Sequence, residues 1–259
     1  MKVTTIYVNN VIKTELVEKY RKSTNRLVLL DYDGTLVNYA PIPDKARPSE
    51  HLIDILIKLV YKPQTKIFII SGRGHQDIDK LLGHLPINII AEHGAVIKEN
   101  GVWEDQIIDN GLWKKSVIPI LNQISLTCPN SFIEEKHFSL TWHYRNSEQQ
   151  SGYDHSRELI SILENIIHSF NLKILDGNKA VEIMTMEIGK GKAVKKLLEQ
   201  NNYDFILSIG DDVTDEEMFE FLLHNTDAFT IKVGNGDSFA KYKLAGINDV
   251  ILLLKQLSV

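Results

Sequence analysis

Short, mostly apolar runs recur along the chain and define its pattern. They are four or five residues long and cover residues 27–30, 67–70, 87–90, 205–209 and 229–233. Apolar runs of this length, bounded by polar residues, are typical of strands that are buried on both faces. The pattern therefore predicts five core strands.

Helical patterns separate these runs. They cover residues 14–26, 49–61, 76–82, 190–200 and 214–223. Strands that alternate with helices predict an α/β fold, here a Rossmann-like, doubly wound parallel sheet that is covered on both faces. Residues 249–257 predict a closing helix, with Asn248 or Asp249 as its N-cap.

The pattern changes between about residues 103 and 184. Strands with polar alternation are flanked there by amphipathic helices. The predicted strands are 131–135 and 139–144, and the predicted helices are 113–126 and 154–170. Alternation of this kind is typical of a sheet with one covered face and one open face. We therefore predict an α+β cap domain at 106–184, inserted into a core domain formed by 1–105 and 185–259.

Composition narrows the class of protein. The 259 residues are 43% hydrophobic, which is enough for a core without disulfides or a structural metal. The net charge of -5 argues against nucleic acid as the main partner, because phosphate backbones are bound by basic surfaces.

Cysteine usage and hydropathy predict a location. Cys128 is the only cysteine, which excludes an internal disulfide and fits a reducing compartment. No stretch is long and apolar enough to span a bilayer, and residues 1–22 lack the apolar block of a signal peptide. We therefore expect a cytoplasmic protein with no membrane partner.

Polar residues follow the predicted strands directly. They are Asp31 and Asp33, Ser71, Glu92 and His93, and Asp211 and Asp212. In open parallel sheets, ligands bind beyond the carboxyl ends of the strands. We therefore expect these side chains to gather at one edge of the sheet, although they are far apart in the sequence.

The first of these loops is Asp31-Tyr32-Asp33-Gly34-Thr35-Leu36. Close carboxylates repel each other, and Mg²⁺ offsets this repulsion because it binds carboxylates together with phosphate oxygens and water. Asp31 could attack phosphorus, while Asp33 protonates the leaving oxygen and later deprotonates a water. Taken alone, the loop also fits a polar turn before a helix, because Asp-Gly pairs are common in turns.

A second acidic loop, Gly210-Asp211-Asp212-Val213-Thr214-Asp215, opens a predicted helix. Asp211 and Asp215 can face one metal ion, directly or through water. A single aspartate there is explained as a helix cap. Three crowded aspartates favour a bound cation, because uncompensated carboxylates repel each other.

Ser71-Gly72-Arg73 and Lys190 are candidate phosphate ligands. A hydroxyl and backbone N–H groups at a helix start can form a phosphate seat, although a plain helix cap is the simpler interpretation of the tripeptide alone. Lys190 begins a helix, where the helix dipole disfavours cations. A buried Lys190 that faces phosphate accounts for this placement.

Together, the four motifs resemble those of the haloacid dehalogenase superfamily phosphatases in order and spacing. The resemblance implies that Asp31 is the nucleophile and Asp33 the general acid/base. The phosphate ligands that it implies are Asp31, Ser71, Gly72, Arg73 and Lys190. It also implies Mg²⁺ as the cofactor, held by the Asp31 carboxylate, the Asp33 backbone carbonyl and Asp211, with Asp212 or Asp215 in support.

A narrower resemblance is to the trehalose-6-phosphate phosphatases, and it covers most of the chain. It rests on residues 30–36, on Ala91-Glu92-His93-Gly94-Ala95, and on residues 134–145 and 210–219. Residues 134–145 discriminate best between families, because they lie in the predicted cap domain. This family places its sugar-reading residues there.

We expect four cap residues to serve the sugar. Glu134, Lys136 and Glu182 are expected to hydrogen-bond the distal glucose, with Arg145 nearby or structural. Carboxylates and basic donors in a closed site suit the many hydroxyls of a disaccharide. The alternative is a solvated sheet face, which we prefer for Glu135 and His137. His143 fits a packing role equally well, and His93 is expected to support the core site.

The resulting hypothesis is hydrolysis of trehalose 6-phosphate to trehalose and phosphate through an aspartyl-phosphate on Asp31. One alternative is a related phosphatase that acts on sucrose phosphate or a glycosyl-phosphoglycerate. Another is a catalytically silent module that binds sugar phosphates, against which the intact motifs argue. Residues 14–30 resemble the start of the phosphatase half of fused synthase–phosphatase proteins, which implies association or fusion with a trehalose-6-phosphate synthase.

Overall fold

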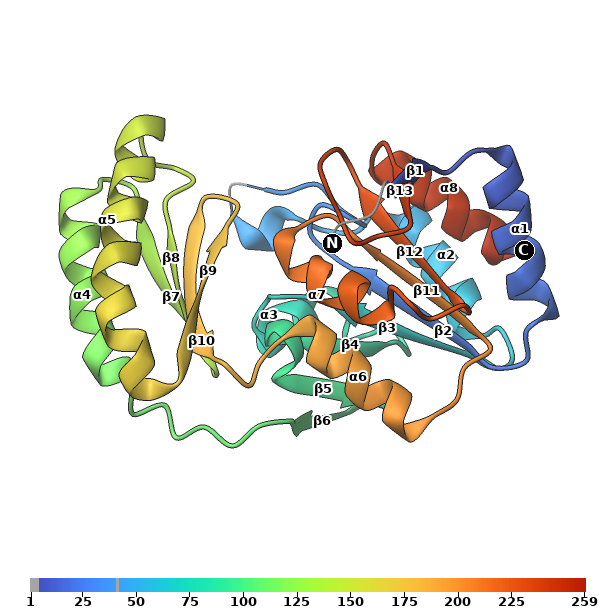
Figure 1. The fold of residues 1–259 in the computed structure, drawn as a ribbon, viewed down its shortest axis with the longest axis horizontal. Helices are drawn as coiled ribbons and strands as arrows, with labels where there is room; N and C mark the ends of the chain where they lie inside the picture. The colour runs from blue at the N-terminus through green and yellow to red at the C-terminus, as the bar shows by residue number, and fades with distance from the viewer. Residues whose placement is uncertain (1–4, 41) are drawn as a thin grey trace. The chain divides into compact units, whose positions relative to one another are not determined.

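The computed structural model describes residues 5–40 and 42–259. Residues 1–4 and 41, which the predicted core domain includes, lie outside the described residues. The chain divides into two compact units. The core unit runs to Gln106 and resumes at Gly189, and the cap unit is Ile107–Ile188 (Figure 1).

The unit boundaries differ slightly from the predicted ones. The first predicted domain ended at 105 and the cap domain at 184, whereas the units end at 106 and 188. The later end of the cap unit has a local cause, because the backbone N–H of Met186 donates to the carbonyl of Asn171 (2.9 Å). This bond ties the segment after the last cap strand to the cap unit.

The described strands of the core unit form one sheet with the order β1-β13-β12-β11-β2-β3-β4-β5-β6. Their bounds are β1 Ile6–Tyr7, β2 Arg26–Asp31, β3 Thr65–Ile70, β4 Asn88–Ala91, β5 Val96–Glu99, β6 Val102–Asp105, β11 Phe205–Gly210, β12 Ala228–Val233 and β13 Tyr242–Leu244. All pairs from β1 to β4 in this order are parallel.

The five predicted strands are parallel, as expected, and the sheet continues at one edge into two antiparallel strands that were not predicted. β5 pairs antiparallel with both β4 and β6. Asn100 and Gly101 form the two-residue link between β5 and β6, and both have positive φ (52° and 82°). Asn-Gly at such a link favours the tight hairpin turn, and parallel strands need a much longer connection.

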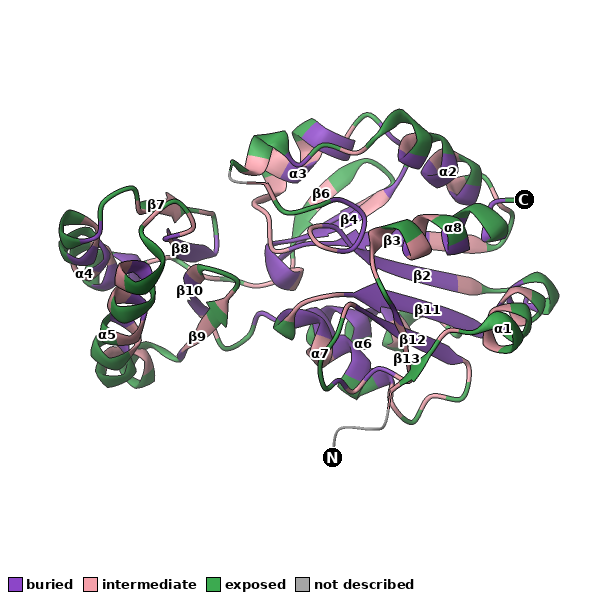
Figure 2. Ribbon diagram, turned by 90° about the horizontal axis from the view of Figure 1, so that it is seen from above, coloured by how far each residue is buried: buried purple, intermediate pink, exposed green. Residues whose placement is uncertain are grey.

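Helices cover both faces of the core sheet (Figure 2). On one face lie α1 Asn10–Lys22, α2 Glu50–Val60, α3 His75–Leu82 and α8 Ile247–Leu257, and on the other lie α6 Lys190–Gln200 and α7 Val213–Leu222. Alternate residues of each strand face opposite layers, so Leu30 of β2 packs in the first core and Leu29 in the second. This arrangement confirms the predicted doubly wound α/β fold.

Two helices of the core unit begin at other residues than predicted. α1 begins at Asn10, four residues before the predicted start at 14, since the Asn9 side chain accepts the N–H of Ile12 (3.0 Å). It ends at Lys22, before β2 begins. The N-cap of α8 is Gly246, and neither Asn248 nor Asp249. Both residues lie inside the first turn of that helix.

The cap unit has a four-stranded antiparallel sheet with the order β7-β8-β10-β9 and two helices. The elements are β7 Phe132–Glu135, β8 Ser139–His143, β9 Leu172–Gly177, β10 Ala180–Thr185, α4 Lys114–Thr127 and α5 Gln149–Ile167. Trp142, Leu140 and Val181 pack with α4 and α5 in one buried cluster. One face of the sheet is therefore apolar, as its alternation predicts.

α5 begins at Gln149, five residues before its predicted start at 154. The carboxylate of Glu148 caps it by accepting the N–H groups of Gln150 and Ser151 (3.1 and 2.7 Å). Among residues 5–40 and 42–259, no helix has the length and apolar character that crossing a membrane requires.

Candidate active site

Asp31 and Asp211 reach the same edge of the core sheet because their strands are parallel neighbours. Leu30 of β2 pairs with Ile209 of β11, so Asp31 closes one strand and Asp211 follows the other directly. In the loop after β2, Gly34 has φ +87°, and a Cβ atom there would lie 2.1 Å from Oδ2 of Asp211. The two loops approach this closely only because residue 34 is glycine.

Lys190, the first residue of α6, bridges two buried carboxylates. Its Nζ donates to Oδ1 of Asp31 (2.7 Å) and to Oδ1 of Asp215 (2.8 Å). Burial lowers the pKa of the Lys190 ammonium, but Asp215 and Asp31 outweigh burial and hold this pKa above its ordinary value. Lys190 is therefore charged and offsets part of the negative charge at the sheet edge.

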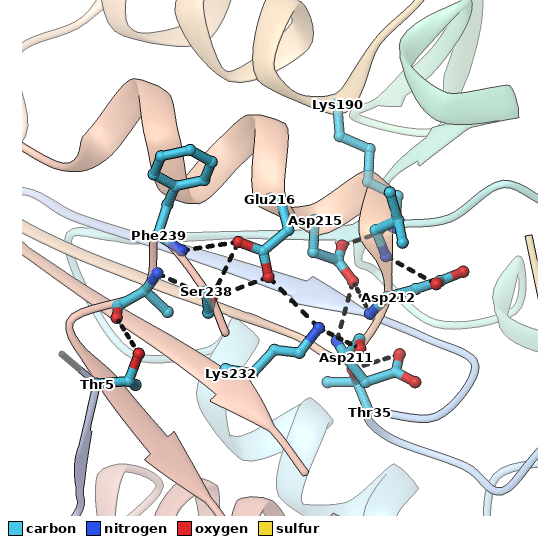
Figure 3. Close-up of polar contacts among 12 residues, drawn as sticks. Thr5, Thr35, Lys190, Asp211, Asp212, Asp215, Glu216, Lys232, Ser238 and Phe239 are labelled. Carbon is cyan, nitrogen blue, oxygen red and sulfur yellow. Dashed lines mark hydrogen bonds and ion pairs between the residues drawn. The ribbon is translucent and has the colours of Figure 1, made fainter. Parts of the chain in front are cut away.

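Asp215 and Asp212 organise the second acidic loop (Figure 3). Oδ2 of Asp215 accepts the backbone N–H groups of Asp211 and Asp212 (2.9 Å each), and Asp212 accepts the N–H of Val213 (2.7 Å). Asp212 and Asp215 together form a capping box at the start of α7. Asp212 and Asp215 are therefore helix-cap residues, whereas the Asp211 carboxylate is not part of the cap.

The Asp211 carboxylate has other contacts. The hydroxyl of Tyr39 donates to its Oδ2 (3.0 Å), and the hydroxyl of Thr35 lies 3.4 Å from its Oδ1. Burial and the neighbouring Asp215 raise the pKa of Asp211 to about 6. These two hydroxyls orient the carboxylate toward the loop that carries Asp31.

The residues at this edge fit a divalent cation. Asp31, Asp211 and Asp215 offer carboxylate oxygens that all lie within 4.8 Å of one another. Burial, with Asp215 as the next largest cause, raises the pKa of Asp31 well above its usual range. Oδ2 of Asp31 is buried and has no hydrogen-bond partner among the described residues. A cation would supply the charge and the partner that these oxygens lack, and clustered carboxylate oxygens suit Mg²⁺.

Asp33 is held by Arg73. The Nε of Arg73 donates to Oδ2 of Asp33 and a terminal nitrogen donates to Oδ1, both at 2.7 Å. Another terminal nitrogen donates to the Pro43 carbonyl (2.9 Å), and the guanidinium lies over the Tyr32 ring. The ion pair raises the pKa of Arg73, although burial opposes it. In this structure the Arg73 guanidinium therefore binds the Asp33 carboxylate.

Ser71 and Gly72 lie where β3 ends, beside the loop of β4. Ser71 is buried, and its hydroxyl accepts the backbone N–H of Arg73 (3.1 Å). The backbone N–H of His93 donates to the Ser71 carbonyl (3.0 Å), and a Cβ atom on Gly72 would lie 2.4 Å from the His93 ring. His93 therefore contacts this loop directly, as expected for a supporting residue. The contact leaves no room for a side chain at position 72.

The predicted sugar residues of the cap unit lie on one face of its sheet. Glu134 and Glu182 both pair in register with Thr141, on strands on either side of β8. Successive strand residues face opposite sides, so this face is the one opposite α4 and α5.

Ion pairs organise this face. Nζ of Lys136 lies 2.8 Å from Oε1 of Glu182, which also accepts the Ser139 hydroxyl (2.6 Å). Nε2 of His143 lies 2.7 Å from Oε2 of Glu134. Burial raises the pKa of Glu134, but His143 and Lys136 outweigh it and lower this pKa below its ordinary value.

Two further residues that the sequence analysis singled out, Arg145 and Glu135, have contacts away from the row of Glu134 and Glu182. Arg145 donates to the Asn178 carbonyl (2.6 Å), at the turn between β9 and β10. Glu135 is exposed, and its Oε1 lies 3.5 Å from Nζ of Lys114. The packing alternative for His143 was incomplete, because its ring stacks on Phe132 and also contacts Glu134.

The structure adds residues that sequence reasoning missed. Tyr39 contacts Asp211, and Lys232 donates to the Asp211 carbonyl (2.5 Å) and pairs with Glu216. One signal was present for Lys232, since it lies inside an apolar strand run, where a buried lysine needs a partner. Tyr39 lies in a loop with no periodic pattern, so the sequence carried no comparable signal for it.

Comparisons with known proteins agree with this site. A family model described as trehalose-phosphatase matches residues 29–247. The bifunctional trehalose-6-phosphate synthase/phosphatase of Thermoproteus tenax is 36% identical over 252 residues, which are 97% of this chain and 34% of that protein. The chain thus spans about a third of the length of the curated relatives that it matches.

Solved structures show the same fold. The C-terminal domain of C. albicans trehalose-6-phosphate phosphatase superposes with a TM-score of 0.91 at 28% identity, covering 100% of this chain and 99% of that one. A haloacid dehalogenase-like hydrolase from B. subtilis shares the fold with a TM-score of 0.61 at 16% identity, covering 89% and 98%. The matched residues include both acidic loops, Lys190 and the polar face of the cap sheet. The chain belongs to the trehalose-phosphatase family and has the haloacid dehalogenase-like fold.

Proposed function

We propose that this chain hydrolyses trehalose 6-phosphate to trehalose and phosphate through an aspartyl-phosphate on Asp31. One observation carries the proposal. Lys190 holds one oxygen of the buried Asp31 carboxylate, and the other oxygen has no partner among the described residues. A carboxylate held in this way presents a free oxygen to an electrophile. Membership of the trehalose-phosphatase family supports trehalose 6-phosphate as the substrate.

In the proposed first step, an oxygen of Asp31 attacks phosphorus and the bond from phosphorus to the sugar oxygen breaks. The leaving oxygen takes a proton from Asp33, so trehalose departs as a neutral alcohol. Both oxygens of Asp33 accept hydrogen bonds from Arg73 in the structure. We therefore propose that one of these bonds opens when Asp33 acts as the acid.

In the proposed second step, Asp33 removes a proton from water, and the water oxygen attacks phosphorus. The bond from phosphorus to Asp31 breaks, which releases phosphate and restores the Asp31 carboxylate. Asp33 then carries the proton that it donates in the next cycle. Lys190 pairs with the restored carboxylate, as in the present structure.

We assign phosphate binding to the Ser71 hydroxyl, the Gly72 backbone and Lys190. The ion pair of Arg73 with Asp33 favours a role in positioning that acid/base. When bound, Mg²⁺ would offset the charge of the phosphoryl group. The residues proposed to hold it are the Asp31 and Asp211 carboxylates and the Asp33 carbonyl, with Asp212 and Asp215 ordering the loop.

We propose that Glu134, Lys136 and Glu182 hydrogen-bond the sugar hydroxyls. Their common face and the well-buried Lys136–Glu182 pair support this proposal. Charged groups that are already oriented by partners lose little conformational entropy when they bind a ligand. For Arg145, the bond to the Asn178 carbonyl favours the structural role.

The partners of the chain are also proposals. Because relatives include a bifunctional synthase/phosphatase, we propose that this domain works in association or fusion with a trehalose-6-phosphate synthase. A cytoplasmic location stays a prediction from the single cysteine.

The test is phosphate release from a panel of esters, with and without Mg²⁺. The panel contains trehalose 6-phosphate, sucrose phosphate, a glycosyl-phosphoglycerate and an aryl phosphate. We expect Mg²⁺-dependent release, with the highest kcat/KM for trehalose 6-phosphate. A higher value for another sugar ester would overturn the substrate assignment. Binding of trehalose 6-phosphate without any phosphate release would support the silent module instead.

A further inference from the structure

A second buried lysine, Lys232, contacts the acidic loop, and the proposed reaction does not use it (Figure 3). It lies on β12, where it pairs in register with Gly210 at the end of β11. Its Nζ donates to the Asp211 carbonyl (2.5 Å) and lies 3.4 Å from Oε1 of Glu216. The side chain thus reaches across the end of the neighbouring strand to the loop that carries Asp211.

Glu216 is itself held by a loop between β12 and β13. Its carboxylate accepts the Ser238 hydroxyl (2.9 and 3.0 Å to its two oxygens) and the backbone N–H of Phe239 (2.8 Å). The Ser238 hydroxyl in turn accepts the N–H of Ala240 (2.9 Å). The partner of the Lys232 ammonium is therefore fixed in position.

These contacts hold the backbone of Asp211 on both sides. Its N–H donates to Asp215, and its carbonyl accepts from Lys232. A residue whose N–H and carbonyl are both bonded to buried side chains has little freedom in φ and ψ. The direction of the Asp211 side chain is set by this backbone, and its carboxylate is one of the clustered acids.

We propose that Lys232 is a positioning residue of the metal site, which presents the Asp211 carboxylate to Mg²⁺ by holding the Asp211 carbonyl. Glu216 keeps the ammonium in place and balances its charge. The proposal rests on the proposed function only for the identity of the metal ion.

If Lys232 acted only through its positive charge, its removal would strengthen Mg²⁺ binding, which is the opposite of what a positioning role predicts. Removing a positive charge near a cation site strengthens cation binding if only the field matters. If Lys232 acts by position, its removal weakens Mg²⁺ binding despite the lost charge. Lys232→Met therefore separates the two accounts, because it keeps the length of the side chain and removes the ammonium.

The experiment is calorimetric titration of the full chain with Mg²⁺ in the absence of substrate. We expect Lys232→Met to raise the Kd for Mg²⁺ by about tenfold or more, as is usual when a residue that orients a metal ligand is lost. Lys232→Arg, which keeps a donor and the charge, should raise it less.

Lys241→Met is the matched control. Lys241 also donates to backbone carbonyls, those of Asn225 and Ala228 (2.6 and 3.0 Å), but at the opposite end of β12. Its loss should leave the Kd unchanged. An equal rise in both variants would indicate general destabilisation and would overturn the positioning role.

A Kd for Lys232→Met at or below that of the unmodified chain also overturns the proposal, provided that circular dichroism shows the native fold. If Lys232→Met does not fold, Ser238→Ala decides the matter, because it removes a hydrogen bond from the Glu216 carboxylate without changing any charge. That variant should raise the Kd, and an unchanged value refutes the role. Because binding is measured without substrate, a chain that binds Mg²⁺ normally but leaves trehalose 6-phosphate intact refutes the proposed function alone.

Discussion

The two oxygens of the Asp31 carboxylate have different surroundings. One accepts a hydrogen bond from Lys190, and the other is buried without a partner among the described residues. Burial and Asp215 raise the pKa of Asp31, whereas Lys190 lowers it. A nucleophile must be ionised, so the balance between these groups and a bound cation sets how well Asp31 can react.

At this scale we predict that Asp31→Asn lowers kcat for trehalose 6-phosphate by at least about 10⁴-fold, as expected for loss of a nucleophile. The fold should persist, because asparagine has the shape of aspartate and relieves repulsion with Asp215. Phosphate release and thermal unfolding measure the two effects. Asp54→Asn, on the exposed side of α2, is the control and should keep its activity. Near-normal turnover of Asp31→Asn would exclude the covalent mechanism.

Among the elements, the strands of the cap unit carry the residues that we propose to contact the sugar. The pairing of β7, β8 and β10 places Glu134, Thr141 and Glu182 in one row across the sheet. The neighbouring residues Ile133, Trp142 and Val181 point to α4 and α5. Because the side-chain period of a strand is two residues, a register shift by one residue would exchange the polar and apolar faces.

We predict that Glu134→Ala and Lys136→Ala each lower kcat/KM for trehalose 6-phosphate about tenfold or more. A lost hydrogen bond to a charged group costs about 1.5–3 kcal/mol, and 1.4 kcal/mol corresponds to a factor of ten. Values for a small aryl phosphate, which has no sugar to contact, should change little. Glu135→Ala is the matched control, since Glu135 is exposed beside Lys114. Equal losses on both substrates would contradict a sugar-reading role.

In the whole molecule, the acidic cluster proposed to hold the metal ion joins segments that are distant in sequence. Lys190 and Asp31 are separated by 159 positions, yet they meet at 2.7 Å, and Asp215 contacts the same ammonium. An ion held by Asp31 and Asp211 binds only when β2 and β11 are paired. Such a ligand binds the folded chain and not the unfolded one, so it stabilises the fold.

We therefore predict that Mg²⁺ raises the Tm of the full chain relative to the same chain in a chelator. At a Mg²⁺ concentration of 100 times its Kd, the free energy of unfolding should rise by about 2.7 kcal/mol. Differential scanning calorimetry measures the shift, and Asp211→Asn should reduce it. Equal Tm values with Mg²⁺ and with chelator would argue that the acidic cluster holds no divalent ion.

Much of the core followed from local patterns. The apolar runs located β2, β3, β4, β11 and β12, and α6 was predicted with its observed bounds, Lys190–Gln200. The start of α1 and the N-cap of α8 were predicted wrongly, because several polar residues near each start could serve as the cap. The antiparallel edge was missed, although Asn100-Gly101 was a readable turn signal.

The sequence by itself determined the order of the core elements, the sheet edge at which the acids gather and the family, because periodicity and loop motifs are local properties. Only the tertiary structure decided the role of each polar atom. In the structure, Asp33 pairs with Arg73, and Asp215 accepts hydrogen bonds from Lys190 and from the backbone at the start of α7. One oxygen of Asp31 has no partner among the described residues. These assignments depend on strand register and on side-chain positions in distant segments, which no local pattern encodes.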